Sequence, residues 1–171
     1  MKKEFLIKTA LSNTQSASLQ RGSPVYVANA SDQEKQGFKD AFKNSLRALE
    51  TRYKQTVPEK DHIRTIQQFV KELSRGDFRD VLVNGRLTIG RAQKAVNLYL
   101  KFLWCLDLIK EPPHCPVDSV VLETIGMNNI PWTRLDSVND YMSIIDTIKR
   151  HCRGQSPAKW ECDVWNNHAN A

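Results

Sequence analysis

The sequence has no long apolar run. An apolar start is cut short by Lys8 and by the polar stretch 12–18, so we expect no secretory signal. The most apolar segment, 95–109, is interrupted by charged and amide side chains, and it is shorter than the roughly 20 residues that a membrane-spanning helix needs. We therefore expect a cytoplasmic protein with no membrane partner, in which 95–109 is a buried helix.

Cysteine is scarce, and the common sequence motifs of enzymes are missing. The four cysteines, at positions 105, 115, 152 and 162, have neither the spacing of a disulfide framework nor that of a zinc site, so we expect free thiols. No Gly-x-Gly-x-x-Gly, Gly-x-x-x-x-Gly-Lys-Ser/Thr or Gly-x-Ser-x-Gly is present. We expect no metal and no cofactor, and the best-known dinucleotide, phosphate-loop and hydrolase classes are disfavoured.

The composition is that of an ordinary globular protein. Apolar residues make up 40% of the chain and charged residues 26%. A length of 171 residues is sufficient for one hydrophobic core, and no internal repeat is visible. We expect a single domain over 1–171. The strand-like runs 5–11 and 25–28 predict that residues 1–30 form an extended N-terminal arm or a hairpin.

Apolar periodicity and helix caps predict a mainly helical fold. Capping boxes at 31–34 and 137–140 begin two helices, and 59–73 has the apolar spacing of another. Arg91–Leu108 is apolar nearly all round, as in a helix that is packed on several sides. Asn84-Gly85 between apolar runs predicts a β-hairpin. The predicted class is mainly α with minor β, with the helices packed around 91–108; an all-helical chain without the hairpin is the alternative.

Positive charge is concentrated in the first two thirds of the chain. The net charge is +6, yet residues 111–171 carry five Lys/Arg against eight Asp/Glu. Two helices of the basic part carry cations at spacings of three and four, and an aromatic residue precedes a cation in the loop near 132. We predict a nucleic-acid-binding or nucleotide-binding protein that acts mainly through electrostatic attraction, with little sequence preference. The predicted binding residues are Lys39, Lys43, Arg47, Lys54, Arg91, Lys94, Lys101, Trp132 and Arg134.

The alternative is an enzyme that acts on nucleic acid or on a small substrate through a proline-stiffened loop. His114, Cys115 and Asp118 lie close together there, and an imidazole, a thiol and a carboxylate can perform nucleophilic or acid/base chemistry. A structural loop with Asp118 as the cap of a following helix also explains them. His62 has no partner in the sequence, so we expect it to be exposed.

Two segments carry a resemblance to other proteins. Ala92–Leu106 and Pro112–Asp118 resemble a set of small uncharacterised bacterial proteins, some of them encoded near prophage genes. The similarity covers about the C-terminal half of the chain. It implies no catalytic or ligand-binding residue, because the set has no established activity, and it favours a setting in bacterial DNA metabolism.

We also expect a homodimer or a larger homo-oligomer. Four tryptophans, one nearly all-apolar helix and strand-like N-terminal runs with little core of their own favour a partner surface.

Overall fold

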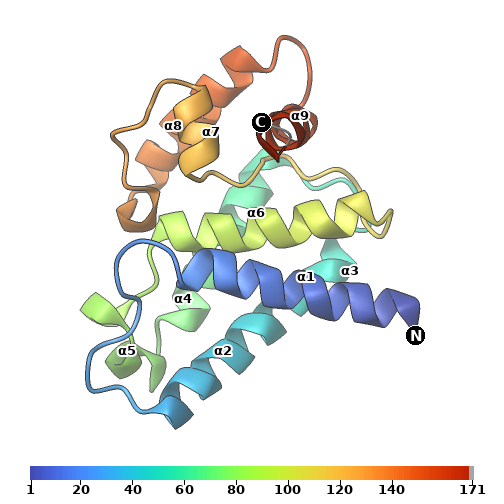
Figure 1. The fold of residues 1–171 in the computed structure, drawn as a ribbon. Helices are drawn as coiled ribbons and strands as arrows, with labels where there is room; N and C mark the ends of the chain where they lie inside the picture. Colours follow the sequence, from blue (N-terminus) through green and yellow to red (C-terminus); the bar gives the residue numbers. More distant parts are fainter. Residues whose placement is uncertain (170–171) are drawn as a thin grey trace.

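The computed structural model describes residues 1–169, and this part of the chain is mainly helical, as predicted. Helices alternate with short loops (Figure 1). In chain order the elements are α1 Lys2–Leu19, α2 Asp32–Arg47, α3 Leu49–Arg52, α4 Glu59–Leu73, α5 Phe78–Val81, the 3-10 turn η1 Val83–Gly85, α6 Ile89–Cys105, α7 Ser119–Thr124, the 3-10 turn η2 Trp132–Arg134, α8 Val138–His151 and α9 Pro157–Ala169.

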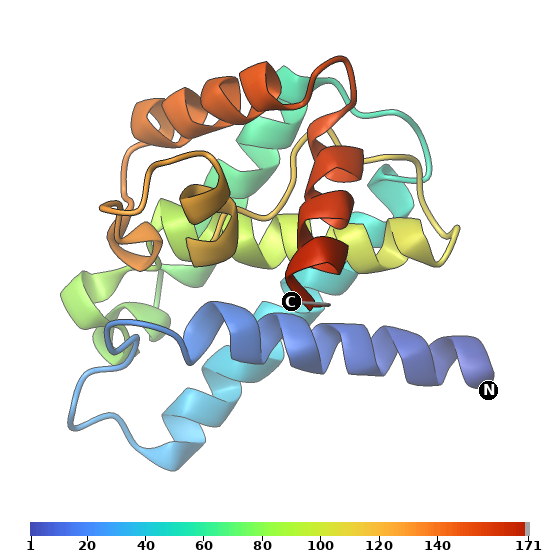
Figure 2. The same cartoon turned by 45° about the horizontal axis from the view of Figure 1, so that its top comes forward.

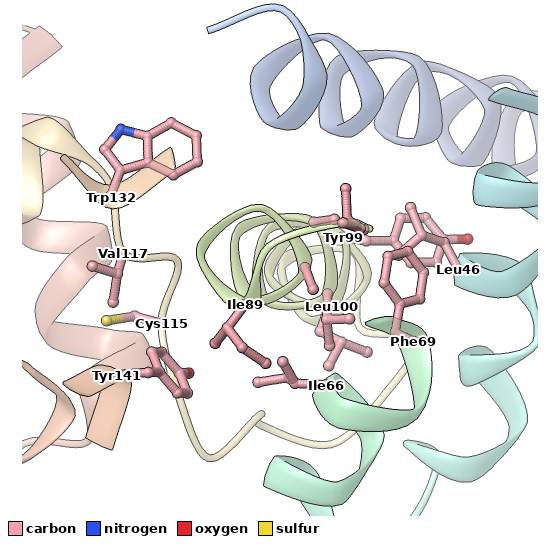
Figure 3. Close-up of a cluster of buried hydrophobic side chains, with 14 of the residues drawn as sticks. Leu46, Ile66, Phe69, Ile89, Tyr99, Leu100, Cys115, Val117, Trp132 and Tyr141 are labelled. Carbon is pink, nitrogen blue, oxygen red and sulfur yellow. The ribbon is translucent and has the colours of Figure 1, made fainter. Parts of the chain in front are cut away.

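Helix α6 is the centre of the fold, which confirms the predicted central helix. Every residue from Ile89 to Lys101 is buried. Helix α1 lies alongside α6 and runs in the opposite direction (Figures 1 and 2). Viewed along α6, side chains of α2 and α4 pack on one side, and those of the 110–118 loop and α8 lie on the other (Figure 3). A helix that is covered on all sides needs apolar residues all round, which is what its sequence has.

The N-terminal prediction is wrong, because residues 2–19 form a helix instead of strands or an extended arm. The buried residues of α1 recur at spacings of three and four, which is the helical period. Two of them, Thr14 and Ser18, are polar. The apolar pattern in the sequence is weak because two of the buried positions of α1, which packs closely against α6, are occupied by small polar residues.

The predicted β-hairpin at Asn84-Gly85 is also wrong. Both residues do take the positive φ angles, 57° and 69°, that its turn requires. However, the flanking runs do not pair with each other. Residues 81–83 pair instead with 25–27, through hydrogen bonds from Val27 N to Val81 O (3.0 Å) and from Val83 N to Val25 O (2.9 Å). This single antiparallel bridge is the whole of the β structure in the described residues.

The predicted helix starts are correct. The Ser31 hydroxyl accepts a hydrogen bond from Glu34 N, and the Glu34 carboxylate accepts one from Ser31 N, which is a complete capping box. Ser137 caps α8 by accepting from Asp140 N. Among the helices described, none is both long and apolar enough to cross a membrane.

Candidate functional site

A groove of about 500 Å³ lies between α1, α6, η2 and the last helix, α9. We call it the aromatic groove because Phe102, Trp132 and Trp165 are among its lining residues. Helix α6 contributes Lys94, Leu98 and Phe102, which are four residues apart and therefore lie along one face of the helix. The remaining lining residues are Asn13, Ala17, Arg21, Gly22, Asp118, Ser119 and Val120.

A nearly buried ion pair lies in the aromatic groove. Lys94 Nζ is 2.6 Å from Asp118 Oδ2, and the two side chains are 7% and 17% exposed. The other carboxylate oxygen of Asp118 accepts from Val121 N and caps α7. An ammonium group carries three hydrogens and Asp118 accepts one, so Lys94 retains donors for a ligand.

Gly90 determines the position of Trp132 in the wall of the groove. A Cβ atom on Gly90 would lie 1.7 Å from the carbonyl oxygen of Trp132, so only glycine allows η2 to approach α6 this closely. Gly90 N donates to Leu135 O (2.7 Å), and the Thr88 hydroxyl donates to Thr133 O (2.9 Å). These contacts hold the indole of Trp132, which is 8% exposed, between the core and the groove.

Arg91 is a buried residue whose hydrogen bonds fix the segment that carries Arg21 and Gly22 to the groove. Its guanidinium donates to the backbone carbonyls of Ser18, in the last turn of α1, and of Arg21 and Ser23, in the turn that follows. This turn carries Arg21 and Gly22 to the groove. Arg91 is therefore a structural residue with a fixed set of partners, not an exposed cation.

The predicted basic strip on α6 does not face solvent. Arg91, Lys94 and Lys101 are only 3%, 5% and 8% exposed. Lys101 Nζ lies 2.6 Å from a carboxylate oxygen of Glu161 in α9, and this pair is buried as well. The spacing of the three cations on one helix face was correctly recognised, but the surface that they were expected to form is covered. Each cation is neutralised by a carboxylate or bound by carbonyls from a segment distant in sequence.

The other predicted binding residues do not converge on the groove. Lys39 and Lys43 are half-buried and Lys54 is exposed, and these three have no ion pair within residues 1–169. Arg47 is paired with Glu4 of α1 at 2.6 Å. Arg134 is exposed and lines a second hollow of about 400 Å³ that Trp132 does not line. Of the predicted set, only Lys94 and Trp132 meet at the aromatic groove.

The loop trio His114, Cys115 and Asp118 is not arranged as a nucleophile with its base. His114 bonds to Glu59 and Tyr141, and Asp118 bonds to Lys94 and caps α7. Cys115 is fully buried, and this burial raises the pKa of its thiol well above the usual value, so it stays protonated. The structural explanation of Asp118 as a helix cap is confirmed.

His62, which we expected to be exposed, is completely buried. It belongs to a chain of hydrogen bonds that crosses the core. Tyr53 Oη lies 2.7 Å from His62 Nδ1, and His62 Nε2 lies 2.8 Å from Asn97 Oδ1. Asn97 Nδ2 donates to Tyr141 Oη at 3.0 Å. The chain continues through His114 to Glu59 at the surface, with distances of 2.7 Å and 2.8 Å.

The carboxylate at the end of this chain sets the direction of the bonds around His114. An ionised Glu59 can only accept, so His114 donates to it from Nε2, and the Nδ1 of a neutral His114 accepts from Tyr141 Oη. In the same way, His62 accepts from Tyr53 at Nδ1 and donates from Nε2 to Asn97. With both imidazoles neutral, every ring nitrogen of His62 and His114 is hydrogen-bonded.

Burial favours the neutral form of the two histidines, whereas neighbouring hydrogen bonds favour the ionised form of Glu59 at the surface end of the chain. Burial lowers the pKa of His62 to about 3, and it also lowers the pKa of His114. The two rings pack edge to face with centroids 4.7 Å apart, so a proton on one would repel a proton on the other. Burial opposes ionisation of Glu59, but hydrogen bonds from Lys149 and His114 outweigh it and lower the pKa of this carboxyl.

Comparisons with known proteins give no match, whether with family models, with curated proteins or with solved structures.

Proposed function

We propose that the protein binds a ligand that combines an aromatic ring with an anionic group, and that the ligand is a nucleotide, free or within a nucleic-acid strand. The observation that carries this proposal is a lysine with unused donors, Lys94, in a groove that Trp132, Trp165 and Phe102 also line. Tryptophan rings stack on any nucleobase, and an ammonium binds phosphate as a point charge.

The size and charge of the groove support this class of ligand. Its volume of about 500 Å³ falls within the roughly 300–1,000 Å³ of small-molecule sites. Lys94 can donate to a phosphate oxygen, while Asp118 beside it offers acceptors for a ribose hydroxyl or a base amine. Arg21 at the rim adds a second cation for the anionic group.

The position of Trp165 allows binding to be followed by tryptophan fluorescence. Its side chain is 43% exposed and lines the groove, so a stacked base should quench its fluorescence. We would titrate the full-length protein with mononucleotides, with dinucleotides and with short single-stranded DNA and RNA, and repeat the titration of the best ligand at several salt concentrations. We expect saturable quenching that weakens as salt is added, because phosphate contacts release counterions.

Two variants and one control test the assignment of the groove. Trp165→Ala removes an exposed ring and should weaken binding about tenfold, since stacking contributes about 1–3 kcal/mol per base. Because this variant lacks the fluorescent reporter, its affinity and that of the wild type are compared by titration calorimetry. Lys94→Met removes the buried cation and should weaken binding to a similar degree or more. Lys60→Met, on the exposed face of α4, is the matched control and should bind as the wild type does. If no nucleotide or oligonucleotide quenches the fluorescence, or if Trp165→Ala and Lys94→Met both bind normally, the proposal is wrong.

A further inference from the structure

Helix α9 is held against the last turns of α6 by a small set of paired side chains. Lys101 and Cys105 lie four residues apart on one face of α6, and Glu161, Cys162 and Trp165 lie together on α9. The Lys101–Glu161 ion pair is 2.6 Å long, and Lys101 Nζ lies 5.9 Å from the centre of the Trp165 ring. These contacts hold α9 against α6 where the two helices cross (Figure 2).

The same contact brings two thiols together. Cys105 lies one helical turn after Lys101 on α6 and Cys162 directly follows Glu161 on α9, so the 2.6 Å ion pair places both cysteines where the two helices meet. The two thiols lie close enough there to interact, although the residues are far apart in the sequence. Cys105 is exposed and Cys162 is half-buried, whereas Cys115 and Cys152 are buried at 0% and 2% exposure. Of the four cysteines, these are the two that solvent reaches, and they lie at the same meeting point of α6 and α9.

The two thiols differ in reactivity. Burial raises the pKa of Cys162 to about 11, even though the ammonium of Lys101 acts in the opposite direction, so Cys162 is a protonated thiol at neutral pH. Cys105 is the one that a solute can reach. An accessible cysteine next to a second, less accessible one is the arrangement of a reacting and a resolving thiol.

We propose that Cys105 and Cys162 form a reversible disulfide when the protein meets a peroxide, and that this bond fastens α9 to α6. The Cys105 thiolate attacks one oxygen of hydrogen peroxide, the O–O bond breaks, and the departing hydroxide takes a proton to become water. Cys105 is then a sulfenic acid. The sulfur of Cys162 attacks the sulfur of Cys105, the S–O bond breaks, and the thiol proton of Cys162 leaves with the hydroxyl as a second water. Two thiols are oxidised and one peroxide is reduced.

The bond has a structural consequence for the aromatic groove. Trp165 is three residues after Cys162, about one helical turn, so a disulfide at Cys162 holds the indole in the wall of the groove. An effect on ligand binding rests on the proposed function above. The chemistry of the thiol pair does not, because it needs no ligand.

The test uses the reduced full-length protein and a stoichiometric amount of hydrogen peroxide. After alkylation of the remaining thiols, non-reducing peptide mass spectrometry should find the Cys105 and Cys162 peptides joined within one chain, with a loss of two hydrogens, and dithiothreitol should reverse the change. The thermal midpoint of the oxidised wild type should rise, because the cross-link restricts the unfolded chain.

Cysteine variants separate the two steps. In Cys162→Ser, peroxide should leave Cys105 as a sulfenic acid that dimedone labels, whereas in Cys105→Ser the thiol of Cys162 should stay reduced for much longer. Cys152→Ser should still form the intrachain bond and is the control. The proposal is overturned if peroxide yields only disulfide between two chains, if it drives Cys105 of the wild type to sulfinic acid without the intrachain bond, or if it leaves the pair reduced. Ligand binding before and after oxidation is measured separately, so a failure of the nucleotide proposal leaves this result intact.

Discussion

The buried histidines should make the protein lose stability as soon as the pH falls below neutral. In the folded protein the pKa of His62 is about 3, whereas an unfolded histidine titrates near 6.5. Between these values the unfolded chain binds a proton that the folded chain does not, so acid favours unfolding. The contribution of the neutral His62 to the free energy of unfolding is fully present above about pH 6.5 and is lost progressively below it. His114 acts in the same direction, because burial lowers its pKa too.

The magnitude follows from the proton difference. Each histidine that stays neutral in the fold reduces the free energy of unfolding by about 1.4 kcal/mol per pH unit below its unfolded pKa. From pH 6.5 to pH 5 this amounts to about 2 kcal/mol for His62 alone. Most carboxyl groups are still ionised in this window, so the histidines dominate the slope. At 5–15 kcal/mol of total stability, a loss of this size is readily measured.

The assay is urea unfolding at pH 7, 6 and 5, followed by tryptophan fluorescence and circular dichroism. The test variant is His62→Gln, which should be less stable at pH 7 because it disturbs the bonds to Tyr53 and Asn97, but which should have a smaller pH dependence by about 1.4 kcal/mol per unit. His151→Gln is the matched control, because it removes an exposed imidazole at the end of α8. Equal stability of the wild type at pH 7 and pH 5, or an undiminished slope in His62→Gln, would refute the reasoning.

Three further predictions concern packing, charge and assembly. Gly90→Ala should reduce the free energy of unfolding by about 1–3 kcal/mol and alter the fluorescence of Trp132, because the added Cβ would lie 1.7 Å from the Trp132 carbonyl oxygen. Gly37→Ala in α2 is the control, because no atom lies within 4 Å of the added Cβ there. Lys101→Met should reduce the free energy of unfolding by about 3 kcal/mol in chemical denaturation, because it leaves Glu161 buried and unpaired. The double variant Lys101→Met/Glu161→Met should recover much of that loss, and no recovery would mean that the ion pair is not the cause. The homo-oligomer expected from the sequence remains a prediction, and a monomer at micromolar concentration in light scattering would contradict it.

Local features of the chain were sufficient to predict most of the helices. Ser31, Glu34 and Ser137 bond to backbone groups only three residues away, so their role is legible in the sequence. The central helix was also predictable, because a helix that is covered on all sides needs apolar residues on all sides. By contrast, α1 was missed because its buried face includes Thr14 and Ser18, which weaken the apolar period.

The partners of polar groups were decided by the tertiary structure alone. Arg91, Lys94 and Lys101 carry the same spacing and charge whether they face water or the interior, and the segments that cover them lie up to 73 residues away. His62 is hydrogen-bonded to Asn97, which lies 35 residues further along the chain. Cys105 and Cys162 lie near each other because α9 folds back across α6. Periodicity specifies which face of a helix a residue occupies, but burial and pairing depend on which other segment packs there. For this chain, local sequence was sufficient for most of the helices and for the central position of α6, but not for α1. The groove, the histidine chain and the thiol pair exist only where distant segments meet.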